Sequence, residues 1–275
     1  MEQNEKNLPE SVSFIRETMA EAMVPPAPLP VRRIMEKLDA CMSRKDYAGA
    51  ERHLNYWLEE PRAAHDLRGE LTIRNEMMGF YRKTGGREQA IACGEAALEL
   101  LEILRDETVS GAGTTYVNFG TVCNTFGENE RALVLFRRAR NIYEGQPATP
   151  PELLGGLYNN MGLACLALGR PDEAMDLYDL AMEQMKKVPC GELEQAITCL
   201  NMADAVEALQ GAEQGEARIM ELLDRAAALL DTPEIPQDGY AAYVYEKCMP
   251  TFAYYGYFLE AERLRDRAEA IHERT

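Results

Sequence analysis

A repeat of 42 residues runs through the middle of this 275-residue chain and constrains its fold more than any other feature. Three segments, beginning at Met77, Phe119 and Met161, align without gaps. Each contains a small or Met residue, a glycine seven positions later, and an alanine five positions after that glycine. The glycines are Gly85, Gly127 and Gly169, and the alanines are Ala90, Ala132 and Ala174. Self-similarity at such a period predicts a solenoid of stacked units.

Looser copies flank the three segments and bring the total to six units. Upstream, residues 46–50 open a helix 40 residues before Ala90, in a unit that lacks the turn glycine. Downstream, one copy begins at Cys199 and another at Tyr245. We expect the turn of the fifth unit, around Gly211 to Gly215, to contain about four extra residues. We also expect Pro250 to kink the first helix of the sixth unit.

Each unit is predicted to be a pair of amphipathic helices joined at the glycine. Before the turn, apolar residues recur at i, i+3, i+7 and i+10, and they do so again after it. In the fourth unit these two sets are Tyr158, Met161, Cys165 and Leu168, then Ala174, Leu177, Tyr178 and Ala181. A glycine such as Gly169 accepts the left-handed conformation that ends many helices. Gly120 and Gly162 lie inside helices, where they predict close approach of a neighbouring side chain.

The small residue, turn glycine, alanine, aromatic and second alanine together resemble the tetratricopeptide repeat. The aromatic positions are Phe136 and Tyr178, and the second alanines are Ala139 and Ala181. The resemblance implies an all-α fold, a right-handed superhelix of about six antiparallel helix pairs that spans residues 31–275. A step of 42 residues exceeds the usual step of about 34. It resembles the long-helix variety in kinesin light chains, as does the run Tyr158–Gly162, and in bacterial peptide-pheromone sensors.

Charge narrows the class of partner. The net charge is −17, and residues 106–275 contain 28 acidic but only 14 basic residues. Such a surface repels phosphate groups, so neither nucleic acid nor an anionic membrane is an expected partner. The acidic residues either attract a basic ligand or simply keep the protein in solution.

Residues 1–30 differ from the repeats. Residues 10–23 can form a leader helix, and residues 24–30 form a Pro-rich linker. The leader helix either caps the first repeat or folds toward the groove. The first ten residues do not resemble a signal peptide, no apolar stretch is long enough to span a membrane, and the seven cysteines show no metal-site spacing. We therefore expect a cytoplasmic protein.

Catalysis is not expected. The three histidines, His53, His65 and His272, fall in separate elements, and packing or surface roles are expected for them. No glycine-rich stretch matches a phosphate-binding loop. The prediction is a protein that is not an enzyme and has no metal site and no cofactor.

Binding is expected on the concave surface that the first helices form in such arrays. One stripe of each first helix should face this groove. The candidate peptide-binding residues are Asn75, Arg82, Lys83, Thr121, Asn124, Asn159, Leu163 and Leu166. Asn and Thr side chains can bond the backbone of an extended peptide, the leucines can accept an apolar side chain, and Arg82 and Lys83 can pair with a carboxylate. Asn118, Asn160 and Asn201 recur at another offset, where the resemblance implies packing between helices.

Two functions remain. The first is a cytoplasmic adaptor or scaffold that holds a protein or peptide segment in its groove. The alternative is a peptide-responsive regulator of the pheromone-sensor type without its own DNA-binding domain. The last helix, residues 258–273, has a narrow apolar stripe and an otherwise charged surface, which predicts a cap and a monomer. The aromatic cluster at residues 254–258 is the alternative contact surface.

Overall fold

Helix follows helix along the described part of the chain, joined by short turns. The computed structural model describes residues 29–104 and 110–274, and all regular structure within these residues is α-helical. The leader helix predicted at residues 10–23 lies outside the described residues. The helices are α2 (Val31–Ser43), α3 (Tyr47–Ala63), α4 (Leu67–Thr84), α5 (Arg87–Leu104), α6 (Ser110–Thr125), α7 (Asn129–Glu144), α8 (Pro151–Ala167), α9 (Pro171–Met185), α10 (Glu192–Gln210), α11 (Ala212–Leu230), α12 (Gly239–Tyr254) and α13 (Phe258–His272).

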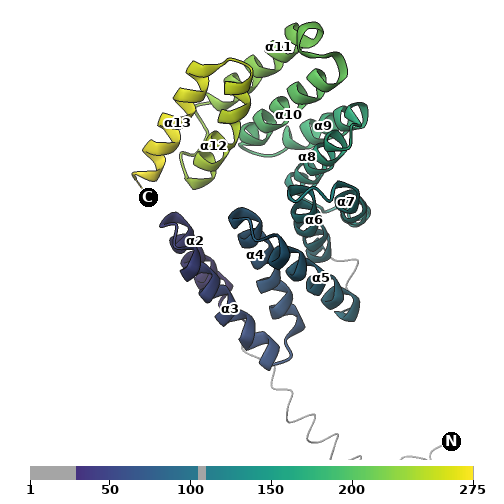
Figure 1. The fold of residues 1–275 in the computed structure, drawn as a ribbon, viewed down its shortest axis with the longest axis vertical. Helices are drawn as coiled ribbons and strands as arrows, with labels where there is room; N and C mark the ends of the chain where they lie inside the picture. Colours follow the sequence, from purple (N-terminus) through teal and green to yellow (C-terminus); the bar gives the residue numbers. More distant parts are fainter. Residues whose placement is uncertain (1–28, 105–109, 275) are drawn as a thin grey trace, which may run out of the picture. The chain divides into compact units, whose positions relative to one another are not determined.

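These twelve helices of the described chain form six successive pairs, as the repeats predict. By their contacts the described residues fall into two units, one up to Glu76 and one from Met77, with the boundary inside α4. In the first unit α2 packs on α3, and Nε2 of His53 lies 3.1 Å from the carbonyl oxygen of Ile34. In the second unit each first helix packs on its own second helix (Figure 1).

The turns between paired helices share one geometry. Gly85, Gly127, Gly169 and Gly256 all have φ between +70° and +82°. The residue after each glycine donates its N–H to a carbonyl five residues earlier, at 2.8–2.9 Å. In the first pair Lys45 takes the same place with φ of 56°, at a steric cost that glycine avoids. The predicted turn positions are confirmed.

The glycines inside the first helices make room for rings of the second helices. A Cβ on Gly162 would lie 2.3 Å from Cε1 of Tyr178, and one on Gly120 would lie 2.4 Å from Cε1 of Phe136. Both rings are fully buried. The prediction that these glycines permit close approach is therefore confirmed.

The prediction of extra residues in the fifth turn is wrong. Gly211, with φ of +78°, alone separates α10 from α11. Gly215 follows Ala203 by 12 residues, the same step that separates Gly162 from Ala174. The extra residues lie later, because Ala261 follows Gly215 by 46 residues instead of 42. They lengthen the connection between α11 and α12.

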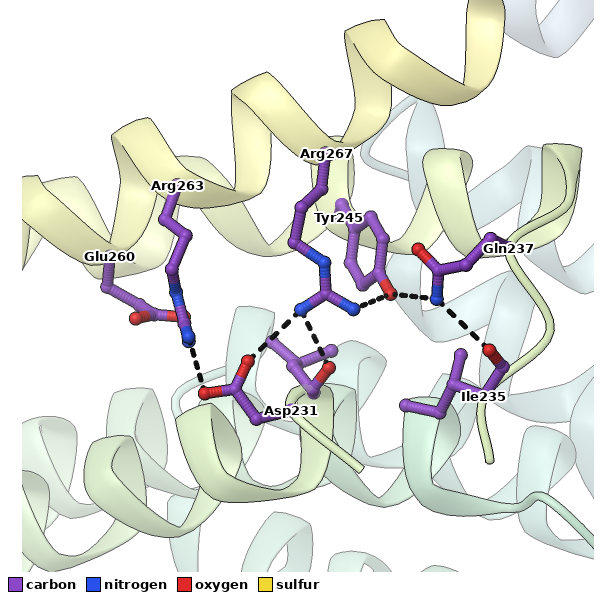
Figure 2. Close-up of polar contacts among 8 residues, drawn as sticks. Asp231, Ile235, Gln237, Tyr245, Glu260, Arg263 and Arg267 are labelled. Carbon is purple, nitrogen blue, oxygen red and sulfur yellow. Dashed lines mark hydrogen bonds and ion pairs between the residues drawn. The ribbon is translucent and has the colours of Figure 1, made fainter. Parts of the chain in front are cut away.

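This longer connection is tied to the last helix by a polar network (Figure 2). Arg267 of α13 donates to the carbonyl oxygen of Leu230 at 2.9 Å, to Asp231 Oδ1 at 3.2 Å and to the hydroxyl of Tyr245. Arg263 also pairs with Asp231 at 2.5 Å. The side chain of Ile235 is only 3% exposed and so anchors the connection in the core.

The last helix has the surface of a cap. Leu264, Ala268 and Ile271 are buried against the chain, whereas Arg265 and Asp266 between them are exposed. α12, which precedes it, is one continuous helix through Pro250. The narrow apolar stripe predicted for the last helix is therefore used within the chain.

Candidate binding surface

The first helices of the second unit form a continuous layer. α6 contacts α8, α8 contacts α10, and α10 contacts α12. In Figure 1 these helices lie on the inner side of this unit, and α7, α9, α11 and α13 lie on the outer side.

A stripe of exposed or partly exposed residues follows each first helix on the side away from its second helix. In α8, Gly162 faces Tyr178 of α9. At about 100° per residue, Asn160, Leu163 and Ala167 lie roughly 100–160° around the helix from Gly162. All three are partly or fully exposed. We call this stripe and its counterparts the inner face: Asn118, Thr121, Thr125, Asn160, Leu163, Ala167, Asp204, Ala208, Lys247, Pro250 and Tyr254.

Two of the predicted site residues lie on this inner face. Thr121 and Leu163 occupy equivalent positions on α6 and α8, and both are half-buried. The Thr121 hydroxyl donates to the carbonyl oxygen of Val117 at 2.8 Å, so its lone pairs are still able to accept a hydrogen bond.

Asn159 differs from its prediction. It is only 6% exposed, and its amide nitrogen donates to the hydroxyl of Thr198 on α10 at 2.9 Å. Its amide oxygen accepts from Asn201 at 3.4 Å. The side chain thus joins α8 to α10 and does not lie on the exposed stripe, because its offset points toward the next first helix.

Asn124 and Leu166 share one offset that lies closer to the neighbouring helix than the inner face does. Both are half-buried. The amide oxygen of Asn124 is buried without a hydrogen-bond partner in the described structure. An unpaired buried oxygen of this kind costs about 1–3 kcal/mol.

The remaining predicted residues lie on α4. Asn75 belongs to the first unit, where it is half-buried and donates to the carbonyl oxygen of Leu71 at 2.9 Å. Arg82 and Lys83 belong to the second unit and are half-buried and exposed, respectively. The Lys83 ammonium lies 5.9 Å from the ring centroid of Tyr243.

Asn160 was assigned a packing role from sequence, but the structure places it on the inner face. Among the described residues no hydrogen bond engages its side chain. Asn201, at the equivalent position of α10, does fit the packing role, because it is 9% exposed and bonds Asn159. The offset alone does not distinguish these two environments.

Carboxylates and phenols gather where α10 meets the last pair. Tyr255 donates to Asp204 at 3.1 Å and to Glu207 at 2.8 Å, and Tyr254 donates to the second oxygen of Glu207 at 3.0 Å. Burial raises the pKa of Asp204, and the hydrogen bond from Tyr255 opposes that rise. This end of the inner face is acidic.

The described side chains do not assemble a catalytic centre. No group of three or more His, Cys, Asp or Glu in the described chain is arranged to hold a metal ion. Burial raises the pKa of Cys123 to about 11 and that of Cys248 to about 12, so neither thiol is a ready nucleophile. None of the helices within residues 29–104 and 110–274 is both long and apolar enough to cross a bilayer.

Residues 70–145 match the family model of the tetratricopeptide repeat. This match covers α5, α6 and α7, where the turn geometry and the glycine–ring contact recur. The chain is a tetratricopeptide-repeat protein. No curated protein matches it in sequence.

Solved tetratricopeptide-like structures share the fold of this repeat protein. The crystal structure of BtubC (BKLC) from P. vanneervenii aligns with a TM-score of 0.65 and 17% identity, covering 82% of this chain and 94% of that one. The crystal structure of a single-substitution variant of a Podosopora anserina putative kinesin light chain, with nearly identical TPR-like repeats, aligns with a TM-score of 0.50 and 17% identity. It covers 76% of this chain and 97% of that one. At this identity the likeness concerns the fold alone. Tetratricopeptide arrays generally mediate protein–protein interaction or scaffolding.

Proposed function

We propose that this repeat protein is an adaptor that binds an extended segment of a partner protein along the inner face of its first helices. The observation that supports the proposal most directly is the continuity of that face. Successive first helices contact each other, and each presents partly exposed side chains at the same offsets. An extended segment can therefore lie across several helices without meeting a gap.

The chemistry of the inner face suits such a segment. Thr121 and Asn160 can exchange hydrogen bonds with a peptide backbone, and Leu163 between them can contact an apolar side chain. Asp204 and Glu207 provide negative charge at one end, where a Lys or Arg of the segment would be attracted. Arg82 and Lys83 would pair with a carboxylate of the same partner.

The proposed setting is a reducing, cytoplasmic compartment, since all seven cysteines are free and six of them are buried. The proposed state is a monomer, because the last helix buries its apolar stripe within the chain.

Comparative capture in the native cell tests the proposal. Tagged wild-type protein and a double variant, Thr121→Arg with Leu163→Arg, are recovered side by side, and the bound proteins are identified by mass spectrometry. A matched control, Val134→Arg, changes a residue of α7 that is 51% exposed on the outer layer. Proteins that bind the inner face should be recovered equally with wild type and control, and at least about tenfold less with the double variant.

Circular dichroism must show that all three proteins are equally helical. Recovery of every bound protein in equal amounts with the double variant would contradict an inner-face site. If only short free peptides compete with the captured partner, the peptide-responsive regulator becomes the better description.

A further inference from the structure

The interface between α11 and α12 differs from the earlier interfaces of the second unit. α10 packs closely on α9, and α8 packs closely on α7, but α12 packs on α10 and makes little contact with α11. The longer connection between α11 and α12 explains the difference. Its buried Ile235 and the Arg267 network fill the space beside the C-terminal end of α11 (Figure 2).

At the opposite end of α11 that space is not filled. A cavity of about 440 Å³ lies between the first half of α11 and the turn that joins α12 to α13. Its apolar wall consists of Ile219, Met220 and Leu223 on one side and the rings of Tyr255 and Tyr257 on the other. This volume falls within the range of about 300–1,000 Å³ that is typical of ligand pockets. None of these five residues belongs to the inner face.

The two tyrosines are held in place by carboxylates. Tyr255 donates to Asp204 and Glu207, and Tyr257 donates to Asp224 at 2.9 Å. Each phenol is thus fixed by a charged acceptor, which keeps the cavity wall in position and adds negative charge beside it.

The cavity itself has an acidic rim. Glu213 and Glu216 line it, while Arg218 and Arg225 project from the opposite side of α11 at about 100° per residue. Arg218 is moreover paired with Glu221 at 2.6 Å. The charge that a ligand meets at this cavity is therefore negative.

Exposed apolar side chains adjoin the cavity in sequence. Tyr254 is 69% exposed, Phe258 is 69% exposed and Leu259 is 84% exposed. They flank the Tyr255–Tyr257 turn on both sides. Exposed residues of this size next to an apolar cavity are typical of a contact surface rather than of plain solvent-facing helix.

We propose that this cavity is a second docking site, which takes one large apolar side chain from a partner segment that has Lys or Arg beside it. Charge complementarity selects this occupant over two others. Residues 1–28 contain five acidic and two basic residues, and a second copy of the chain has the same net charge of −17. Both would meet the Glu213 and Glu216 rim with the wrong sign.

Peptide display tests the proposal directly. A phage library of random short peptides is selected on the full-length protein and counter-selected on the variant Ala212→Phe. Ala212 lines the cavity and is itself exposed, so the larger side chain should occupy the cavity without disturbing the core. Circular dichroism checks that the variant is folded.

The enriched peptides should share an aromatic or aliphatic residue next to Lys or Arg. They should bind at least about tenfold more weakly to Ala212→Phe than to wild type. They should bind the inner-face variant Thr121→Arg with Leu163→Arg as wild type does, so this result is independent of the proposed adaptor function. The variant Glu213→Gln with Glu216→Gln should weaken binding and flatten its salt dependence.

Three results would overturn the inference. One is the absence of peptides that distinguish wild type from Ala212→Phe, or the enrichment of peptides without basic residues. Another is tighter peptide binding by a leader variant, Phe14→Asp, which would make the chain's own leader the occupant. The third is a dimer in light scattering that Ala212→Phe dissociates, which would make a second copy the occupant.

Discussion

Replacing Gly162 by alanine tests the contact that recurs at each repeat. A Cβ at this position would lie 2.3 Å from the ring of Tyr178, whereas ordinary contacts begin near 3.4 Å. The ring would have to retreat by about 1 Å, and it is fully buried. Overpacking of this kind costs about 2–3 kcal/mol, and the better helix propensity of alanine returns about 1 kcal/mol. We expect a net loss of about 1–2 kcal/mol in the free energy of unfolding.

Gly156 provides a matched control in the same helix. A Cβ there would have no neighbour within 4 Å, so Gly156→Ala should gain about 0.5–1 kcal/mol from propensity alone. Urea unfolding followed by circular dichroism measures both variants. Because a repeat array does not always unfold in one step, hydrogen exchange in α8 and α9 supplements the global measurement.

A double-mutant cycle links the cost to the ring. In a Tyr178→Leu background the space beside residue 162 opens, and Gly162→Ala should then be neutral or stabilising. If Gly162→Ala stabilises the wild-type protein as much as Gly156→Ala does, the packing argument fails.

Three further predictions concern the turns, a buried carboxylate and the last pair. Gly127→Ala should lose about 1 kcal/mol at φ of +81°, whereas Lys45→Gly should gain about as much at φ of 56°, both measured by urea unfolding. Burial raises the pKa of Glu194, so wild type loses stability as pH rises through that pKa. Glu194→Gln removes this loss, and its melting temperature relative to wild type should increase from about pH 4 to about pH 7. Arg267→Ala should cost about 1–2 kcal/mol and speed hydrogen exchange in α12 and α13, unlike the exposed Arg265→Ala.

The repeat register could be predicted from sequence because its determinants are local. A left-handed turn needs glycine at Gly127 or Gly169, and a ring beside Gly162 needs a missing side chain, so both constraints leave a mark at fixed spacing. The fifth unit misled the prediction for the same reason. Gly211 has the expected positive φ but lies one position later, directly before α11, so alignment on the glycine introduced an insertion that the turn does not contain.

The binding surface could be predicted only in part. Thr121 and Leu163 were placed correctly on the exposed stripe, since their offset depends on one helix pair alone. Asn159 was misplaced because its burial depends on how α8 packs on α10, through Thr198 and Asn201. The cavity beside α11 leaves no pattern in sequence, because it results from a gap between elements and not from a set of residues at regular spacing.

The pattern of neighbours has a consequence for how this chain matures on the ribosome. In the described second unit, helices that pack together are adjacent in sequence or separated by one helix. Low sequence separation between contacting residues favours rapid folding, and folding of an array can spread from one pair to the next. Each pair can therefore dock on its predecessor soon after it emerges, while later pairs are still being synthesised. The α12–α13 pair, which emerges last, would complete the array by covering α10 and closing the Arg267 network.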